Sequence, residues 1–180
     1  NLRAVYNRAV ERNLTPQHYP FRHVYTGIDK TVKRALPARV IRQLKCLDLS
    51  ASPSLQFARD MFLFSFYTRG MSFIDMAYLR NKDLSHGFLT YCRRKTRQQL
   101  TIKWERCMQE IIDRYHIPDS PYLLPIIRPS HRIDERTQYI YASNKVNKSL
   151  KIIGCMLHLH QPLTLYVSRH SWASIARSMN

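Results

Sequence analysis

The segment from Phe57 to Tyr67 constrains the fold more than any other, because its side chains are apolar around almost the whole circumference of a helix. Ser52-Pro53 precedes it and is typical of a helix start, with proline in the first turn. A helix that is apolar on all sides is buried on all sides. The segment therefore predicts a central, buried helix whose Phe and Met side chains belong to the core.

Shorter periodic segments predict the elements around this helix. Apolar residues at helical spacing indicate helices over residues 37–47, 72–79, 104–115 and about 138–158, and a last helix that follows Thr164. Residues 87–93 and 99–102 alternate instead and predict two strands joined by a basic turn. The sequence thus predicts a mostly α fold with a small antiparallel β-hairpin sheet.

The charge balance indicates the class of partner. Lysine and arginine number 29 against 12 aspartates and glutamates, which gives a formal net charge of +17 and predicts a polyanionic partner. A hydrophobic share of 44% excludes a disordered basic tail. The four glycines are too scattered for a Gly-rich nucleotide loop, and no apolar run approaches the roughly 20 residues that cross a bilayer. The separated cysteines predict reduced thiols in a cytoplasmic protein.

Helix and turn signals divide the chain into three parts. Residues 1–14 hold an amphipathic helix that ends at Thr15-Pro16, and we expect it to be the last helix of a preceding domain. Residues 15–36 carry turn signals and predict a linker and domain entry, whose basic residues include Arg22, Lys30, Lys33 and Arg34. Residues 37–180 then form one further domain.

Two basic features have no simple structural explanation. Residues 93–97, Arg-Arg-Lys-Thr-Arg, place four cations at the tip of the predicted hairpin, where they fit a solvated turn and a phosphate-binding loop equally well. Arg169 lies between apolar residues of the last helix, which is an unfavourable place for an unpaired charge. Together they favour a binding site for phosphates.

Three ordered segments resemble motifs of the tyrosine recombinases, also called phage-type integrases. Residues 166–173, Tyr-Val-Ser-Arg-His-Ser-Trp-Ala, resemble their H-x-x-R-H-[ST]-x-A signature, and Lys95 resembles their hairpin lysine. Residues 66–79 are similar to their T-G-x-R-x-x-E-x-x-x-L box, in the variant common among Bacteroidetes mobile-element integrases. The resemblance implies that residues 1–14 end a core-binding domain and that residues 37–180 are a catalytic domain, truncated at its C-terminus.

The resemblance also implies a reaction. In this family a tyrosine attacks a DNA phosphodiester, forming a 3′-phosphotyrosyl link and releasing a 5′-hydroxyl, without metal, nucleotide or other cofactor. Arg169 would grip the non-bridging oxygens, and Lys95 would protonate the departing 5′-oxygen. The implied partner is duplex DNA, with a tetramer on two DNA sites for the full-length protein and no membrane. The implied DNA contacts are Arg93, Arg94, Arg97, Lys145 and Lys148.

Two positions depart from the family pattern. Tyr166 occupies the place of the signature histidine, and tyrosine can donate a hydrogen bond to phosphate but is a poor general base near neutrality. Ser72 occupies the register of the first arginine. Arg69 lies three residues earlier, near one helical turn, and Arg93 lies two residues before Lys95 on the same strand face. We favour Arg69 as the first arginine over Arg93.

One acidic residue and three histidines complete the set of candidate residues. Asp75 is either a residue that favours a helix start or the acidic residue that orients the first arginine in the family. His170 follows the signature arginine, and we expect it to pack or hydrogen-bond beneath the site. His158 and His160 form an isolated H-x-H pair, which is not expected to bind metal.

The positions of the tyrosines are a further departure from the family pattern. In the family a G-H/W box and the nucleophilic tyrosine follow the R-H box, but all 11 tyrosines of this chain lie at or before Tyr166. The nucleophile is therefore expected to be absent, so that the chain is an inactive fragment of a longer recombinase. The alternative is a catalytically inactive DNA-binding regulator on the same fold. A basic RNA-binding protein explains the charge but not the apolar setting of Arg169.

Overall fold

The computed structural model describes residues 2–24, 34–129 and 132–179. The chain forms two compact units, which divide between Lys33 and Arg34. Two of the basic residues predicted for the linker, Lys30 and Lys33, lie outside the described residues. None of the helices in the described ranges is long and apolar enough to cross a membrane.

The first unit contains the predicted N-terminal helix, α1 (Leu2–Glu11), none of whose residues is buried. Tyr6 joins this helix to the segment that follows it. Its hydroxyl accepts a hydrogen bond from the backbone N–H of His18 at 2.8 Å, and its ring packs edge-on against Phe21 with ring centroids 5.9 Å apart. The chain after α1 therefore folds back along the helix.

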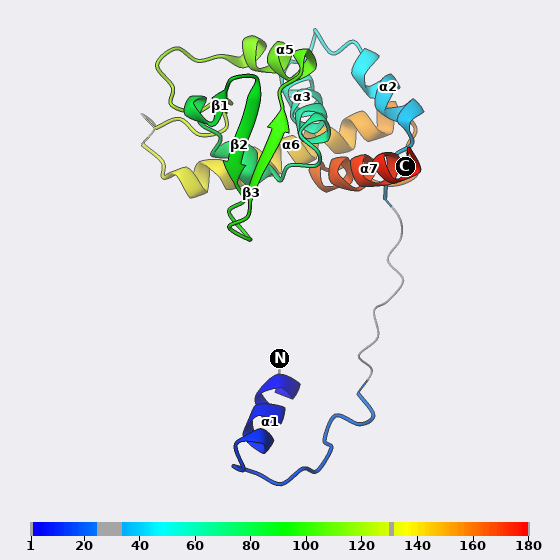
Figure 1. Cartoon of the computed structure of the whole chain (residues 1–180). Coiled ribbons are helices and arrows are strands. Elements are labelled where there is room, and N and C mark those ends of the chain that lie inside the picture. Colours follow the sequence, from blue (N-terminus) through cyan, green and yellow to red (C-terminus); the bar gives the residue numbers. More distant parts are fainter. Residues whose placement is uncertain (1, 25–33, 130–131, 180) are drawn as a thin grey trace. The chain divides into compact units, whose positions relative to one another are not determined.

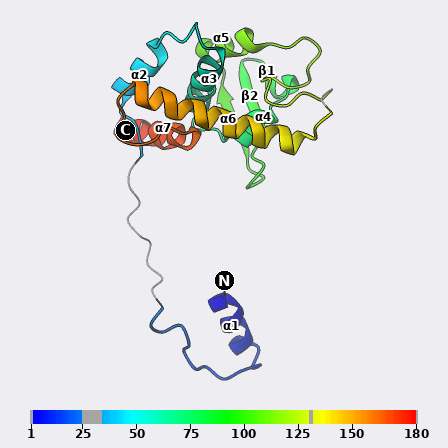
Figure 2. The ribbon, with the colours of Figure 1, turned by 180° about the vertical axis from the view of Figure 1, so that it is seen from behind.

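The second unit is built around α3 (Pro53–Tyr67), which begins at the predicted Ser52-Pro53 signal. Every residue from Ala58 to Ser65 is buried, so the prediction of a central helix is confirmed. The helices α6 (Glu135–Met156) and α7 (Leu165–Ser178) both pack against α3 (Figures 1 and 2). Apolar side chains from all of these helices form one core.

The remaining helices are short. They are α2 (Ala38–Cys46), α4 (Phe73–Ala77), the 3-10 helix η1 (Asn81–Asp83) and α5 (Arg106–Tyr115). Of these, α2, α4 and α5 contribute further side chains to this core. The long helix α6 begins a few residues earlier than predicted, because the side chain of Asp134 accepts a hydrogen bond from the N–H of Thr137 and so caps it.

The predicted hairpin is present, as part of a sheet with one additional strand. The strands β1 (Leu84–Ser85), β2 (Phe88–Cys92) and β3 (Gln99–Lys103) are antiparallel in the order β1-β2-β3. The additional strand β1 spans only two residues, which is too short for an alternating pattern to be visible in the sequence. In Figure 1 the connection between β2 and β3 extends away from the helices. The predicted fold class, mostly helical with a small antiparallel sheet, is confirmed.

Two charged residues lie inside the apolar part of α3. Asp60 is 2% exposed and accepts hydrogen bonds from Arg59 Nε at 2.9 Å, Arg114 at 2.6 Å and the Tyr115 hydroxyl at 2.8 Å. Arg59 also donates to the carbonyl of Leu47 at 2.6 Å. This group of side chains joins α3 to α5 and to the loop after α2, and it satisfies the hydrogen-bonding capacity that burial would otherwise leave unmet.

Candidate phosphate-binding site

The site begins at the turn that ends α3. Arg69 and Gly70 both have left-handed backbone angles, with φ of 59° and 76°, and the N–H of Gly70 returns to the carbonyl of Ser65 at 2.8 Å. Glycine is favoured at such a position because it has no Cβ to clash with the backbone. The turn brings the backbone of Gly70 directly against α7.

Arg169 of α7 is fixed on this turn. Its Nε donates a hydrogen bond to the carbonyl of Gly70 at 2.6 Å, and a Cβ on Gly70 would lie only 2.9 Å from the Cα of Arg169. Glycine thus permits a contact that no other residue would allow. The half-buried arginine embedded in an apolar helix thus has a backbone acceptor, and it lines the cavity described below.

A pair of buried serines joins α7 to α3 next to Arg169. The hydroxyls of Ser65 and Ser168 hydrogen-bond to each other, and Ser65 also donates to the carbonyl of Met71 at 2.7 Å. Both serines are at most 2% exposed. Because Ser168 precedes Arg169, this contact fixes the helix that presents the guanidinium. Sequence reasoning missed the pair, since an isolated serine in an apolar helix carries no distinctive signal.

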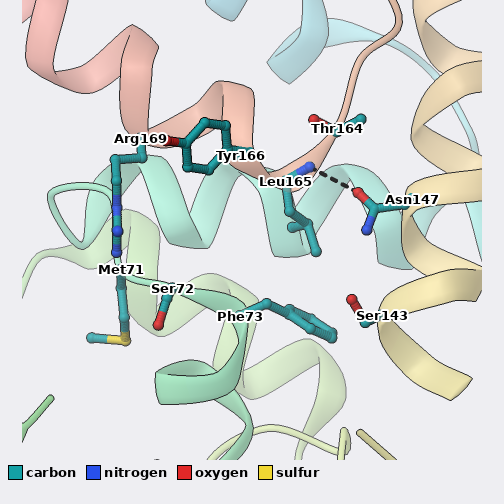
Figure 3. A pocket seen from close by; sticks show the side chains of 9 residues that line it. All are labelled: Met71, Ser72, Phe73, Ser143, Asn147, Thr164, Leu165, Tyr166 and Arg169. Carbon is teal, nitrogen blue, oxygen red and sulfur yellow. Dashed lines mark hydrogen bonds between the residues drawn. The ribbon is translucent and has the colours of Figure 1, made fainter. Parts of the chain in front are cut away.

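A cavity of about 330 Å³ opens beside Arg169 between α4, α6 and α7 (Figure 3). Among the lining residues, Asn147 of α6 is bonded to α7: its side-chain oxygen accepts a hydrogen bond from the N–H of Leu165 at 3.0 Å. This bond satisfies the first turn of α7, whereas the side chain of Thr164 does not cap the helix. The lining residues are Met71, Ser72, Phe73, Ser143, Asn147, Thr164, Leu165, Tyr166 and Arg169.

Two of the predicted site residues, Tyr166 and Arg169, line this cavity together with Ser72. Tyr166 is 59% exposed, and its ring packs edge-on against that of His170 with centroids 4.4 Å apart. His170 is half-buried beneath this ring. The residue in the register of the family histidine thus lies beside Arg169 with its hydroxyl accessible. Ser72, in the register of the first arginine, also faces the cavity but brings no charge.

Four of the predicted cations, Arg93, Arg94, Lys95 and Arg97, lie in the hairpin turn between β2 and β3. The Arg93 N–H donates to the carbonyl of Gln98 at 2.8 Å, and the Arg97 N–H donates to the carbonyl of Arg93 at 2.8 Å, so residues 93–98 form a closed turn. Lys95 and Arg97 are exposed, and Arg93 is half-buried. Cys92, Arg93, Arg94 and Arg97 line a smaller cavity of about 270 Å³.

Asp75 connects the hairpin turn to the residues that line the cavity beside Arg169. One of its carboxylate oxygens accepts a hydrogen bond from the N–H of Arg94 at 2.9 Å, and the other accepts one from the hydroxyl of Ser72. Ser72 caps α4 as predicted, accepting from the N–H of Asp75 at 3.4 Å. Both carboxylate oxygens are therefore used at the base of the hairpin, and within the described residues Asp75 makes no ion pair with an arginine.

The pKa of the Tyr91 hydroxyl is affected by the charges of both Arg93 and Arg169. Burial within the sheet, together with the nearby negative charge of Asp75, raises the pKa of the Tyr91 hydroxyl to about 12. The positive charges of Arg93 and Arg169 act in the opposite direction on the same hydroxyl. Both arginines therefore lie within electrostatic range of one ring.

Arg69 and Lys95 have no such link to Arg169. Arg69 is exposed, and in the part of the chain that the structure describes its side chain has no hydrogen-bond or ion-pair partner. Neither residue lines the cavity beside Arg169. The site therefore contains Arg169 and Tyr166 as a pair, with the hairpin cations anchored nearby through Asp75.

The other candidates from the sequence are not among the residues that line the cavity. Lys145 and Lys148 are exposed on α6, and His158 and His160 are exposed after its end. Over the described ranges, no three His, Cys, Asp or Glu side chains gather in a way that could hold a metal ion. The four cysteines are free thiols.

Comparison with known proteins identifies the fold. By sequence, the chain matches none of the known family models and none of the curated proteins. By structure, it is similar to a lambda integrase (75-356) dimer bound to a COC′ core site, with a TM-score of 0.60 and 14% identity, over 97% of this chain and 63% of that one. It is also similar to a lambda integrase tetramer bound to a Holliday junction, with a TM-score of 0.60 and 16% identity, over 98% of this chain and 52% of that one.

A third similar structure is XerA recombinase, with a TM-score of 0.53 and 14% identity, over 83% of this chain and 53% of that one. This chain therefore spans between about half and two thirds of the length of the proteins it matches. Its mostly helical second unit with a small three-stranded sheet has the fold of the tyrosine recombinase catalytic domain.

Proposed function

We propose that this chain is the DNA-binding catalytic region of a site-specific tyrosine recombinase, in which Arg169 holds the DNA phosphate that is cleaved. The observation that carries the proposal is the setting of Arg169, a half-buried arginine fixed by Gly70 at the edge of a cavity that it shares with Tyr166. Further support comes from the fold and from the net charge of +17.

The proposed chemistry distributes roles among three residues. A tyrosine oxygen attacks the phosphorus while the bond to the 5′-oxygen breaks, which leaves a 3′-phosphotyrosyl link. Arg169 stabilises the charge that develops on the non-bridging oxygens, and the Tyr166 hydroxyl donates a hydrogen bond to the same phosphate. Lys95 donates a proton to the departing 5′-oxygen. The reaction needs no cofactor.

A second arginine is expected at the phosphate, since two guanidiniums hold its oxygens better than one. We assign this role to Arg93 rather than to Arg69, which the sequence favoured. In support, Arg93 is half-buried and influences the same Tyr91 hydroxyl as Arg169, whereas Arg69 is exposed. The remaining phosphate contacts proposed are Arg97 on the hairpin and Lys145 and Lys148 on α6.

The wider assembly is proposed by analogy. One lambda integrase structure similar to this chain is a tetramer on a Holliday junction, which supports a tetramer on two DNA sites for the longer protein. The motif of residues 66–79 supports the mobile-element variant of the family. We further propose a cytoplasmic location, where the free cysteines would stay reduced.

Binding to duplex DNA is expected to depend steeply on salt. If about 5–8 phosphates are contacted, log K should fall against log salt concentration with a slope of about −4 to −7, because each contact releases counterions. Fluorescence anisotropy with labelled duplexes of two unrelated sequences measures the slope and the sequence preference. A slope near zero, or binding to RNA that duplex DNA fails to displace, would argue against the proposal.

The 180-residue chain alone is expected to form no covalent DNA adduct on a suicide substrate. No tyrosine follows Tyr166, and Tyr166 lies on the same rigid helix as Arg169, where it can bind the phosphate but not attack it in line. Denaturing gel electrophoresis detects an adduct directly. An adduct mapped to any tyrosine of this chain would show that the nucleophile has been misassigned.

The alternative function is a catalytically inactive DNA-binding regulator on the same fold. A version carrying a tyrosine-containing C-terminal extension from the same gene separates the two functions. The recombinase forms an adduct that requires Arg169, whereas the regulator binds DNA in the same salt-dependent way and forms none.

A further inference from the structure

Arg94 differs from the other cations of the hairpin turn in having partners on α4. Its guanidinium carbon lies 3.8 Å from the centroid of the Tyr78 ring, which is a cation–π contact. Its backbone N–H donates to the carboxylate of Asp75 at 2.9 Å. The same residue is thus attached at both ends of α4, to Asp75 in its first turn and to Tyr78 at its C-cap.

Both partners are themselves held in place. Asp75 is 5% exposed, and its second carboxylate oxygen accepts from Ser72, which lines the cavity beside Arg169. The Tyr78 ring packs edge-on against the Tyr122 ring, with centroids 6.1 Å apart. An attachment to two fixed groups sets the direction of a turn that is otherwise exposed to solvent.

Arg97 provides the contrast within the same turn. Its side chain is exposed and, over the described ranges, makes no hydrogen bond or ion pair. Arg94 is exposed as well, but one face of its guanidinium is covered by the Tyr78 ring, so its orientation is set within the protein, whereas the Arg97 guanidinium is free to follow a phosphate. Arg94 and Arg97 therefore differ in how the turn holds them, although both belong to the same basic segment.

We infer that Arg94 is a positioning residue, which pins the basic hairpin to α4 through Tyr78 and Asp75, and that it is not one of the phosphate contacts. The consequence of this inference rests on the proposed function. Arg94 would hold the turn so that Arg93, Lys95 and Arg97 face the DNA. Asp75 and Ser72 would fix the position of that turn relative to the Arg169 cavity. It replaces the DNA-binding role that the sequence suggested for Arg94.

The first test is amide hydrogen exchange measured by NMR. Arg94→Gln and Tyr78→Leu should each speed the exchange of the Arg94 N–H by about 2- to 5-fold, the factor that corresponds to loss of one exposed cation–π contact. Tyr78→Phe keeps an aromatic face and should exchange like the wild type. The double variant Arg94→Gln, Tyr78→Leu should exchange no faster than either single variant, since both remove the same contact. Amides of α3 serve as the internal reference for global stability.

The second test is the salt dependence of duplex DNA binding. Arg97→Gln should reduce the magnitude of the slope by about 0.9, as expected for one lost phosphate contact. Arg94→Gln should leave the slope unchanged. Equal losses of slope in the two variants, or unchanged exchange of the Arg94 N–H in both Arg94→Gln and Tyr78→Leu, would overturn the inference.

The two tests also separate this inference from the function on which it rests. If the wild-type protein shows no salt-dependent DNA binding, the proposed function fails, while the exchange measurement still decides whether Arg94 pins the hairpin. If DNA binding is salt-dependent but Arg94 behaves like Arg97, the function stands and the positioning role is wrong.

Discussion

Replacing Asp60 by asparagine is expected to lower the free energy of unfolding by about 3–5 kcal/mol, the cost typical of breaking a buried ion pair from one side. The substitution keeps the shape of the side chain but removes the charge that faces Arg59, whose side chain is 10% exposed. Oδ1 of Asp60 accepts from Arg59 and Oδ2 accepts from Arg114 and the Tyr115 hydroxyl, and asparagine replaces one of these two oxygens by an NH2 group that cannot accept. Urea denaturation followed by circular dichroism measures the change.

Glu110→Gln is the matched control for this prediction. Glu110 pairs with Arg106 on the same helix α5, but the two side chains are 56% and 92% exposed. Because water screens an exposed pair, its loss should cost less than about 1 kcal/mol. Equal effects of the two substitutions would mean that the buried group around Asp60 does not contribute to stability as its contacts suggest.

Replacing Gly70 by alanine is expected to lower the free energy of unfolding by about 2–5 kcal/mol. About 1–2 kcal/mol comes from the left-handed backbone angle, which an L-residue adopts unfavourably. A further ~1–3 kcal/mol comes from overpacking, because the new Cβ would lie 2.9 Å from the Cα of Arg169 and 3.0 Å from its Cγ. These are atoms of a packed helix, so α7 itself must shift.

Comparison with Gly87→Ala separates the overpacking cost at Gly70 from the cost of the left-handed backbone angle. Gly87 has the same φ of 76°, but a Cβ there would meet nothing within 4 Å. Its alanine variant should therefore show only the backbone cost, and the difference between the two variants reports the contact with Arg169. Chemical denaturation of both variants under one set of conditions gives this difference. A difference near zero would show that Arg169 is not held against Gly70 in solution.

The sequence predicted those parts of the fold whose signals are local. The central helix follows from the apolar residues of α3, its start from Ser52-Pro53, and the start of α4 from Ser72. Strand alternation predicted the hairpin in the same way. Cap chemistry and periodicity act over a few residues, so a single sequence is enough to read them.

Local signals failed where the burial of a side chain depends on a distant partner. The sequence identified α3 as apolar but not the burial of the charged pair Arg59 and Asp60 within it, because Asp60 is also paired with Arg114, which lies 54 positions away. The early start of α6 was missed for a smaller reason, since the periodic pattern did not reveal that Asp134 caps it.

In the candidate site, too, the sequence predicted local contacts and missed contacts between residues that are distant along the chain. The sequence alone placed Arg169 near Tyr166, because residues three apart share one face of a helix. Only the tertiary structure joined Arg169 to Gly70, which lies 99 positions earlier, and Ser168 to Ser65, which lies 103 positions earlier. Only it attached Arg94 to Tyr78 and Asp75. A periodic pattern reports which face of a helix is buried, whereas the packing of whole helices decides which residue that face meets.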